Sequence, residues 1–192
     1  MMTRLPRLLL LYFLLVPLQV AAIDIGFSKS DPDEKRQKID DATAEILADL
    51  YREVPGSQEV VEAGVGHAVF ASLGLNVLAL STANGSGVAH YDSGEKVYMK
   101  MFSAGGGVGM GVKQYRLVFT FANQEAMDQF VEEGWTAGAQ ADAAAKYEDD
   151  GDAAALAIDV SPGVRLYQMT EAGVALQATI QGTKYWKDED LN

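Results

Sequence analysis

The chain has 192 residues, with 15 Lys and Arg against 27 Asp and Glu, a net charge of −12, and no cysteine. This length, with 48% hydrophobic residues, suits a single globular domain. The excess of acidic groups argues against a nucleic-acid partner, and the lack of cysteine excludes disulfides, thiolate metal sites and a cysteine nucleophile.

The N-terminus has the pattern of a secretory signal peptide. Arg4 and Arg7 precede an apolar run, and small residues lead up to Ala22. An uncleaved membrane anchor is the alternative, but the run is short for a hydrocarbon layer of about 30 Å and a proline interrupts it. We therefore expect a signal peptide over 1–22, and a periplasmic or secreted protein over 23–192 that carries a net charge of −14.

A helical segment is predicted over residues 31–64. Asp31 is placed to cap a helix whose first residue is Pro32, and a short second helix is expected after Ser57. The first helix carries an apolar stripe at three- and four-residue spacing, made of Ile39, Ala42, Ile46, Leu47 and Leu50. Its polar face is not basic, which favours packing on a core over lying on a membrane surface.

The next region is rich in glycine, valine and aromatic residues, which is typical of strands. Turn signals at Asn84-Gly85 and Asp92-Ser93-Gly94 predict tight hairpin turns that join these strands. The expected strands are 67–72, 75–82, 86–92 and 95–104. Four glycines then alternate between Gly105 and Gly111, and such a bare strand face predicts a strongly curled sheet.

A helix over 124–133, capped by Asn123, interrupts the predicted sheet. The later strands are expected at 135–146, 153–160, 164–170 and 173–186, with an acidic turn at 148–152. The residues from Lys187 to Asn192 are expected to form a frayed polar tail. Together the segments predict one α+β domain: an N-terminal helical part over 31–64, then a curled antiparallel or barrel-like sheet over 65–186 that contains the inserted helix.

Recognisable catalytic and metal-binding patterns are absent from the sequence. The two histidines, His67 and His90, have no carboxylates at ligand spacing, and the acidic run at 148–152 lacks the ligand ladder of a calcium loop. Ser93 and Lys96 match a serine–lysine spacing, but they fall on a predicted hairpin turn. We therefore expect no metal, no cofactor and no enzymatic activity; an enzyme whose carboxylates only the fold brings together is an alternative.

The charge is distributed unevenly along the chain. Residues 23–64 carry a net charge of −6, residues 65–121 of +2, and residues 122–192 of −10. In the strand over 95–104, Val97, Met99 and Met101 alternate with a second set that lies on the opposite face, Lys96, Tyr98, Lys100 and Phe102. This second face predicts contact with an acyl chain or an anionic headgroup. The alternative is a solvated face above a Met and Val core.

From about Val60 to Lys184 the chain resembles the SYLF domain family. The resemblance is carried by the segments Ala63-Gly64-Val65-Gly66-His67-Ala68-Val69-Phe70, Gly85-Ser86-Gly87-Val88, the run from Gly105 to Gly111 into Tyr115-Arg116-Leu117-Val118-Phe119, Gly134-Trp135-Thr136-Ala137-Gly138-Ala139, and Gly182-Thr183-Lys184. Eukaryotic members of the family bind lipid and associate with actin, and bacterial members are mostly exported.

The resemblance and the charge pattern together imply an exported, non-enzymatic domain that binds lipid or another apolar ligand at or near a membrane. An envelope protein-interaction or structural domain is the alternative, in which the acidic segments steer a basic partner. Because the signal peptide would direct the chain away from cytoplasmic actin, we expect no actin partner.

Overall fold

An amphipathic helix, α1 (Pro32–Glu53), begins the part of the chain that the computed structural model describes, residues 31–137, 157–170, 173–174 and 182–192. The Asp31 side chain accepts a hydrogen bond from the Asp33 N–H at 3.0 Å, as its predicted capping role requires. The chain then turns through Gly56, whose φ of 87° favours glycine, into α2 (Ser57–Ala63). Both predicted N-terminal helices are confirmed.

Two long strands, β1 (Gly66–Tyr91) and β2 (Lys96–Phe121), form one antiparallel hairpin. Its turn lies where Asp92-Ser93-Gly94 predicts one, with the Tyr91 N–H donating to the Glu95 carbonyl at 2.9 Å. The predicted turn at Asn84-Gly85 is wrong, because these residues pair with Phe102 and Met101 inside the continuous ladder. Pairing along the whole of β2 outweighs the local turn preference. The region in which four strands were expected therefore contains two long strands.

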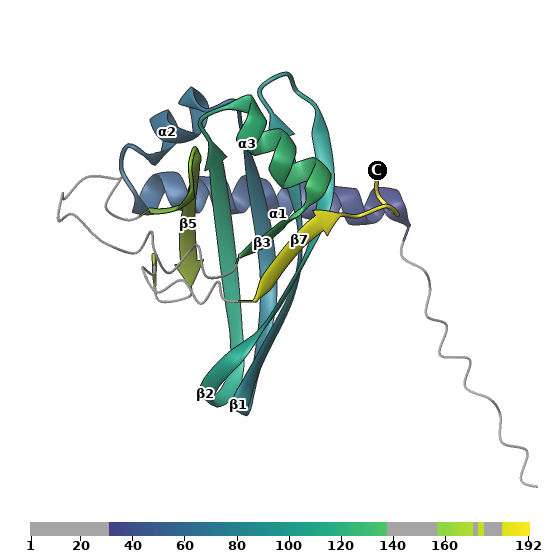
Figure 1. Cartoon of the computed structure of the whole chain (residues 1–192), viewed down its shortest axis with the longest axis vertical. Helices are drawn as coiled ribbons and strands as arrows, with labels where there is room; N and C mark the ends of the chain where they lie inside the picture. The colour runs from purple at the N-terminus through teal and green to yellow at the C-terminus, as the bar shows by residue number, and fades with distance from the viewer. Residues whose placement is uncertain (1–30, 138–156, 171–172, 175–181) are drawn as a thin grey trace, which may run out of the picture.

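The hairpin curls back on itself, as Figure 1 shows at the lower end of β1 and β2. The first and last parts of β1 consequently lie against each other. A Cβ atom on Gly85 would lie 2.6 Å from the Ala71 carbonyl oxygen, and one on Gly87 would collide with Val69 and Phe70. Glycine is required at these positions because the two halves of the strand approach too closely for a side chain.

The later strands extend the sheet from both ends of β2, in the order β3-β7-β2-β5-β4. Residues 116–121 of β2 pair with β5, and residues 99–103 pair with β7. The bounds of these strands are β3 (Trp135–Ala137), β4 (Ile158–Ser161), β5 (Val164–Thr170), β6 (Gly173–Val174) and β7 (Thr183–Lys187). The predicted class, α+β with a curled antiparallel sheet, is confirmed.

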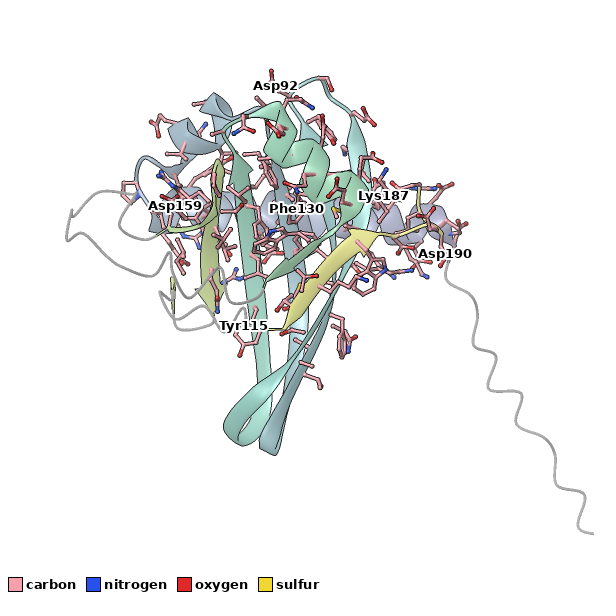
Figure 2. All side chains as sticks on the ribbon, viewed as in Figure 1. Asp92, Tyr115, Phe130, Asp159, Lys187 and Asp190 are labelled. Atoms are coloured by element: carbon pink, nitrogen blue, oxygen red, sulfur yellow. The ribbon has the colours of Figure 1, made fainter. Side chains whose placement is uncertain are left out.

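One face of the sheet is covered by α3 (Gln124–Asp128) and a π-helical turn, η1 (Gln129–Glu133), in the place of the predicted helix. Aromatic rings fill this core: Phe70 and Tyr185 lie 4.9 Å apart between centroids, and Phe130 packs on both (Figure 2). The predicted inward side chains of the 95–104 strand, Val97, Met99 and Met101, are buried in the same cluster.

The opposite face of the sheet is covered by α1. Ile46 and Leu50 pack on Val69, Val118 and Tyr167. Nearer its N-terminus, the helix places Ile39 against a second small cluster formed by Val88, Tyr98 and Leu191. The apolar stripe of the helix therefore packs on the protein core, as expected for a helix whose polar face is not basic. No helix in the described residues is long and apolar enough to cross a bilayer.

The expectation of a frayed C-terminal tail is wrong. Asp188 and Leu191 are buried, and the Asn192 side chain forms hydrogen bonds with both backbone groups of Tyr98, at 2.9 and 2.8 Å. These tertiary contacts hold residues whose composition alone is typical of an exposed end.

Several predictions fall outside the described residues: the signal peptide, the strand beyond Ala137, the turn at 148–152, and most of the strand expected between β6 and β7. Residues 105–111 belong to β2, but their side chains are outside the description.

Candidate functional site

A groove of about 610 Å³ lies between α1 and the curled hairpin, and we call it the α1 groove. Its apolar surface is formed by helix and strand residues, among them Ile39, Ala42, Ile46, Val69 and Ala71. Lys35, Lys38 and Lys100 also line it, with Asp188 as the acidic member. An apolar groove bordered by ammonium groups has the composition that an amphiphile with a negative head requires.

Two of the four predicted site residues, Lys96 and Tyr98, contact α1. The Lys96 ammonium lies 2.9 Å from Asp40 Oδ2, and the Tyr98 hydroxyl donates to the same oxygen at 3.2 Å. Tyr98 is 8% exposed, so burial, followed by the charge of Asp40, raises the pKa of its hydroxyl. These two side chains hold α1 on the sheet, and their contact with lipid stays a prediction.

The third predicted residue, Lys100, borders the α1 groove. Its ammonium lies 2.6 Å from the buried Asp188 carboxylate and 3.4 Å from Asp190. The hydrogen bond to Asp188 is the main reason that the pKa of Lys100 is raised. Figure 2 shows Asp190 beside the first turns of α1. Lys100 thus remains a cation at every physiological pH, with its charge largely balanced by the C-terminal segment.

The fourth predicted residue, Phe102, is 40% exposed and is the one large apolar side chain exposed among the described residues. It pairs in register with Asn84, which lines the α1 groove. An exposed aromatic ring next to an apolar groove is a feature of surfaces that meet an apolar ligand or partner.

Lys35 and Lys38 are groove residues that the sequence reasoning did not select. Lys38 pairs with Glu34 on the helix surface at 2.6 Å, whereas Lys35 makes no ion pair with any described residue. Their signal in the sequence is their spacing, because Lys35 lies four residues before Ile39 and Lys38 four before Ala42, on the buried stripe. Only the position of α1 over the hairpin shows that a groove lies beside this part of the apolar stripe.

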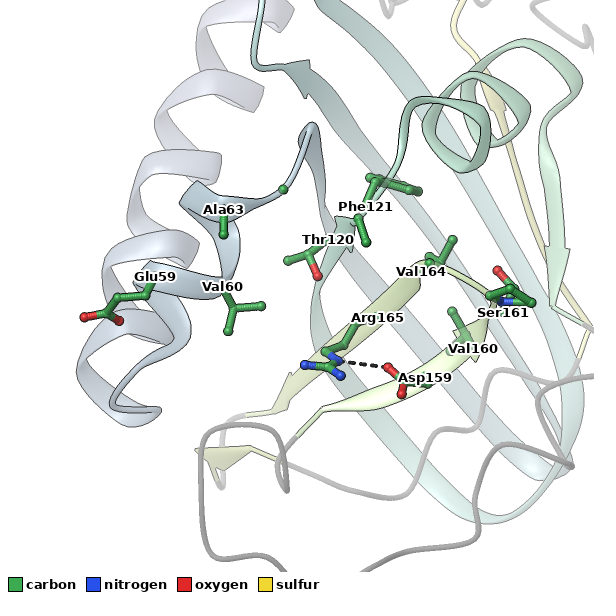
Figure 3. Close-up of a pocket in the computed structure, with 14 residues that line it drawn as sticks. Glu59, Val60, Ala63, Thr120, Phe121, Asp159, Val160, Ser161, Val164 and Arg165 are labelled. Carbon is green, nitrogen blue, oxygen red and sulfur yellow. Dashed lines mark hydrogen bonds and ion pairs between the residues drawn. The ribbon is translucent and has the colours of Figure 1, made fainter.

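A second and larger groove, of about 1010 Å³, lies between α2 and the β4–β5 turn, and we call it the α2 groove (Figure 3). Val60 of α2 faces a floor that includes Phe121, Val160 and Val164. Its charged groups are of a different kind, since Arg165 donates to Asp159 at 2.8 Å and is thereby neutralised. The described residues contain no cluster of three His, Cys, Asp or Glu side chains placed to hold a metal ion.

Residues 102–192 match the Ysc84 family, described as "Las17-binding protein actin regulator". The chain is also 36% identical over 159 residues to Beta cell expansion factor A of Aeromonas veronii. That alignment covers 82% of this chain and 59% of the relative, so the chain spans less than two thirds of that protein's length.

The family match begins later than the predicted resemblance and extends past Lys184 to the end of the chain. It therefore includes Asp188, the ion-pair partner of Lys100, and Asn192, which contacts Tyr98; the resemblance left out both residues. Both matches confirm the predicted resemblance of this chain to the SYLF (Ysc84) family.

Proposed function

We propose that this protein is a non-enzymatic domain that binds an amphiphilic lipid in the α1 groove, at or near a membrane outside the cytoplasm. The observation that carries the proposal is the pairing of an apolar floor with three lysines in one groove of about 610 Å³. The acyl chain would lie along Ile39, Ala42 and Ala71, and the negative head would approach Lys35, whose charge no described carboxylate balances.

The resemblance to the SYLF family supports this proposal only at the level of class. Members of the SYLF family include lipid-associated proteins, which makes a lipid ligand a reasonable expectation for the groove. The N-terminal sequence supports an extracytoplasmic location, because its charged and apolar regions are typical of a signal peptide. Cell fractionation with N-terminal sequencing of the purified protein tests that location, and a protein that keeps its first residues in the cytoplasm would contradict it.

Vesicle flotation tests the binding. The purified chain is mixed with vesicles of phosphatidylcholine alone, or with phosphatidylglycerol added, and native mass spectrometry is used to search for retained lipid. We expect flotation with the anionic vesicles that weakens as salt rises, because headgroup attraction is screened over about 10 Å at 0.1 M salt. No flotation with either vesicle and no retained lipid would refute the proposal.

Lys35→Glu is the sharpest variant for this test, because it reverses a groove charge without breaking an ion pair to a described residue. Lys187→Glu is the matched control: it changes the net charge equally, and its partner Glu132 lies in η1 on the other face of the sheet. We expect Lys35→Glu to weaken flotation several-fold more than Lys187→Glu. Equal losses would show that only the total charge matters.

The α2 groove favours a second candidate function, the binding of a protein segment. Its floor is apolar, Glu59 adds negative charge beside the neutral Arg165–Asp159 pair, and β4 pairs on one side only among the described strands. These features suit a partner with apolar and basic residues. Crosslinking in an envelope fraction tests this function: Val60→Asp, on the partly exposed face of α2, should abolish a specific crosslink and leave flotation unchanged. A crosslink that survives Val60→Asp would argue against this groove.

A further inference from the structure

The two histidines of the chain stack on each other from opposite ends of β1. Their rings lie 5.1 Å apart between centroids, and their planes differ by 7°. Beside them, the Asp92 N–H donates to the Val65 carbonyl at 3.0 Å and joins the same two ends of the strand. The His67–His90 pair therefore lies where the curled hairpin closes.

The pair belongs to the face of the sheet that α1 covers. His67 lies two residues before Val69, and His90 two residues after Val88; both valines pack on α1 or its neighbouring cluster. Side chains two apart in a strand share a face, so the rings lie in the same interface between α1 and the sheet as the α1 groove, which Val69 also lines.

The charged groups facing the pair come from α1 and β2. Asp40 of α1 and Lys96 of β2 both act on His90, and Lys96 is its register partner. Asp40 uses one oxygen for Lys96 and Tyr98, while its other oxygen and His90 Nε2 are buried without a hydrogen-bond partner among the described residues. The single negative charge of Asp40 already faces the Lys96 ammonium, so two protonated histidine rings would leave this group of side chains with a net positive charge.

Both rings are neutral at pH 7. Burial, followed by the proximity of His90, lowers the pKa of His67 to about 4. Burial and then the charge of Lys96 lower the pKa of His90, against a smaller opposing effect of Asp40. A histidine exposed to water has a pKa near 6.5. A state in which α1 has moved away from the sheet and exposes the rings therefore binds protons at a higher pH than the closed state, in which α1 covers them. The closed state is fully favoured at neutral pH, and its free-energy advantage decreases as the pH falls below about 6.5.

We propose that the His67–His90 pair is an acid-sensitive latch, and that protonation of the two rings loosens α1 on the sheet and widens the α1 groove for lipid. The proposal rests on the lipid-binding function inferred for that groove. Two imidazolium charges about 5 Å apart, with Lys96 beside them, repel one another at an interface where Asp40 is the facing carboxylate. The aromatic core on the other face contains no histidine and keeps the sheet folded while α1 moves.

Hydrogen exchange of the full chain without lipid, at pH 7.4 and pH 5.0 and corrected for the intrinsic rate at each pH, tests the latch. For a histidine with pKa values of about 4 when closed and about 6.5 when open, opening at pH 5.0 should rise on the order of tenfold or more. We expect peptides over α1 to lose protection by this factor, while β2 residues 116–121 keep theirs. Unchanged protection of α1 at pH 5.0 would overturn the latch.

The double variant His67→Gln/His90→Gln keeps polar side chains that do not titrate. We expect α1 in this variant to exchange equally at the two pH values. If the variant does not fold, NMR titration of the histidine ring protons in the natural protein replaces it: the pKa of His67 should lie near 4 and that of His90 below its ordinary value, and an ordinary pKa of 6.5 for both rings would overturn the latch.

Flotation with phosphatidylglycerol vesicles at the same two pH values separates the latch from the proposed function. Opening of α1 together with stronger flotation at pH 5.0 supports both. Opening of α1 without flotation at either pH would overturn the lipid function and the coupling to it, leaving only the acid-driven movement. Flotation that is independent of pH, with a protected α1, would overturn the latch and leave the lipid function standing.

Discussion

The ammonium of Lys100 on β2 lies 2.6 Å from the buried carboxylate of Asp188, the residue that follows β7. This contact joins a residue selected from the charge pattern of its strand to a segment expected to be frayed. It makes Lys100 part of the framework that holds the C-terminal residues on the sheet, as well as a border of the α1 groove.

Reversal of the charge at Lys100 should therefore reduce stability. Lys100→Glu leaves Asp188 buried without its cation and adds a third carboxylate beside Asp190, so we expect the free energy of unfolding to fall by about 2 kcal/mol. Urea denaturation measures it. Lys187→Glu, which disrupts an exposed pair with Glu132, should cost about 1 kcal/mol or less. Equal losses of unfolding free energy in the two variants would show that the Lys100–Asp188 pair contributes no more to stability than an exposed ion pair.

Substitution of Gly87 should disrupt the curl of β1. A Cβ atom there would collide with the Val69 carbonyl and the Phe70 ring, so Gly87→Ala should lower the free energy of unfolding by about 2 kcal/mol or more, or prevent folding. Gly94→Ala is the comparison, because Gly94 has a φ of 91° but open space around it, and backbone strain alone costs about 1 kcal/mol. A smaller loss for Gly87→Ala than for Gly94→Ala would contradict the close approach within β1.

Removal of the exposed ring of Phe102 should affect lipid binding more than folding. Phe102→Ala removes a side chain that is 40% exposed, so we expect the midpoint of urea unfolding to change little and flotation with anionic vesicles to fall several-fold. Phe102→Leu should recover most of the flotation because it restores apolar area. A loss of stability as large as the loss of flotation would assign Phe102 a structural role instead.

Acidification should destabilise the protein through His67. Because the pKa of His67 is about 4 in the folded chain and near 6.5 in the unfolded chain, the unfolded state binds the proton first. The free energy of unfolding should therefore fall as the pH drops from 6.5 to 4, by about 2 kcal/mol for a half-buried ring. Thermal unfolding of the natural chain and of His67→Gln measures it; an identical pH dependence in both would contradict the prediction.

Local patterns were sufficient to predict the helices and the alternation of the 95–104 strand. Asp31 and Asn123 cap helices through hydrogen bonds to backbone N–H groups two and three residues later, so this interaction can be predicted from the local sequence. Met99 and Met101 are buried on one face and Tyr98 on the other, as a period of two requires.

Long-range contacts account for the predictions that were wrong. Asn84-Gly85 has the local signature of a turn, yet Gly85 serves a close approach to Ala71 and Ser72 across the curled strand. Asn192 is held by the backbone of Tyr98, which lies 94 residues earlier in the chain. The α1 groove depends in the same way on where the helix lies, so Lys35 becomes a candidate only once α1 is placed over β1.

Photo-crosslinking with a diazirine-bearing phosphatidylglycerol, followed by peptide mapping, tests the central claim most directly, because it reports where the lipid lies. The α1 groove predicts labels on α1 and on β1 residues near Ala71 and Ser86, which diminish in Lys35→Glu and persist in Lys187→Glu. Labels confined to the α2 groove around Val60 and Val160, or no label above that of a soluble control protein, would contradict the account.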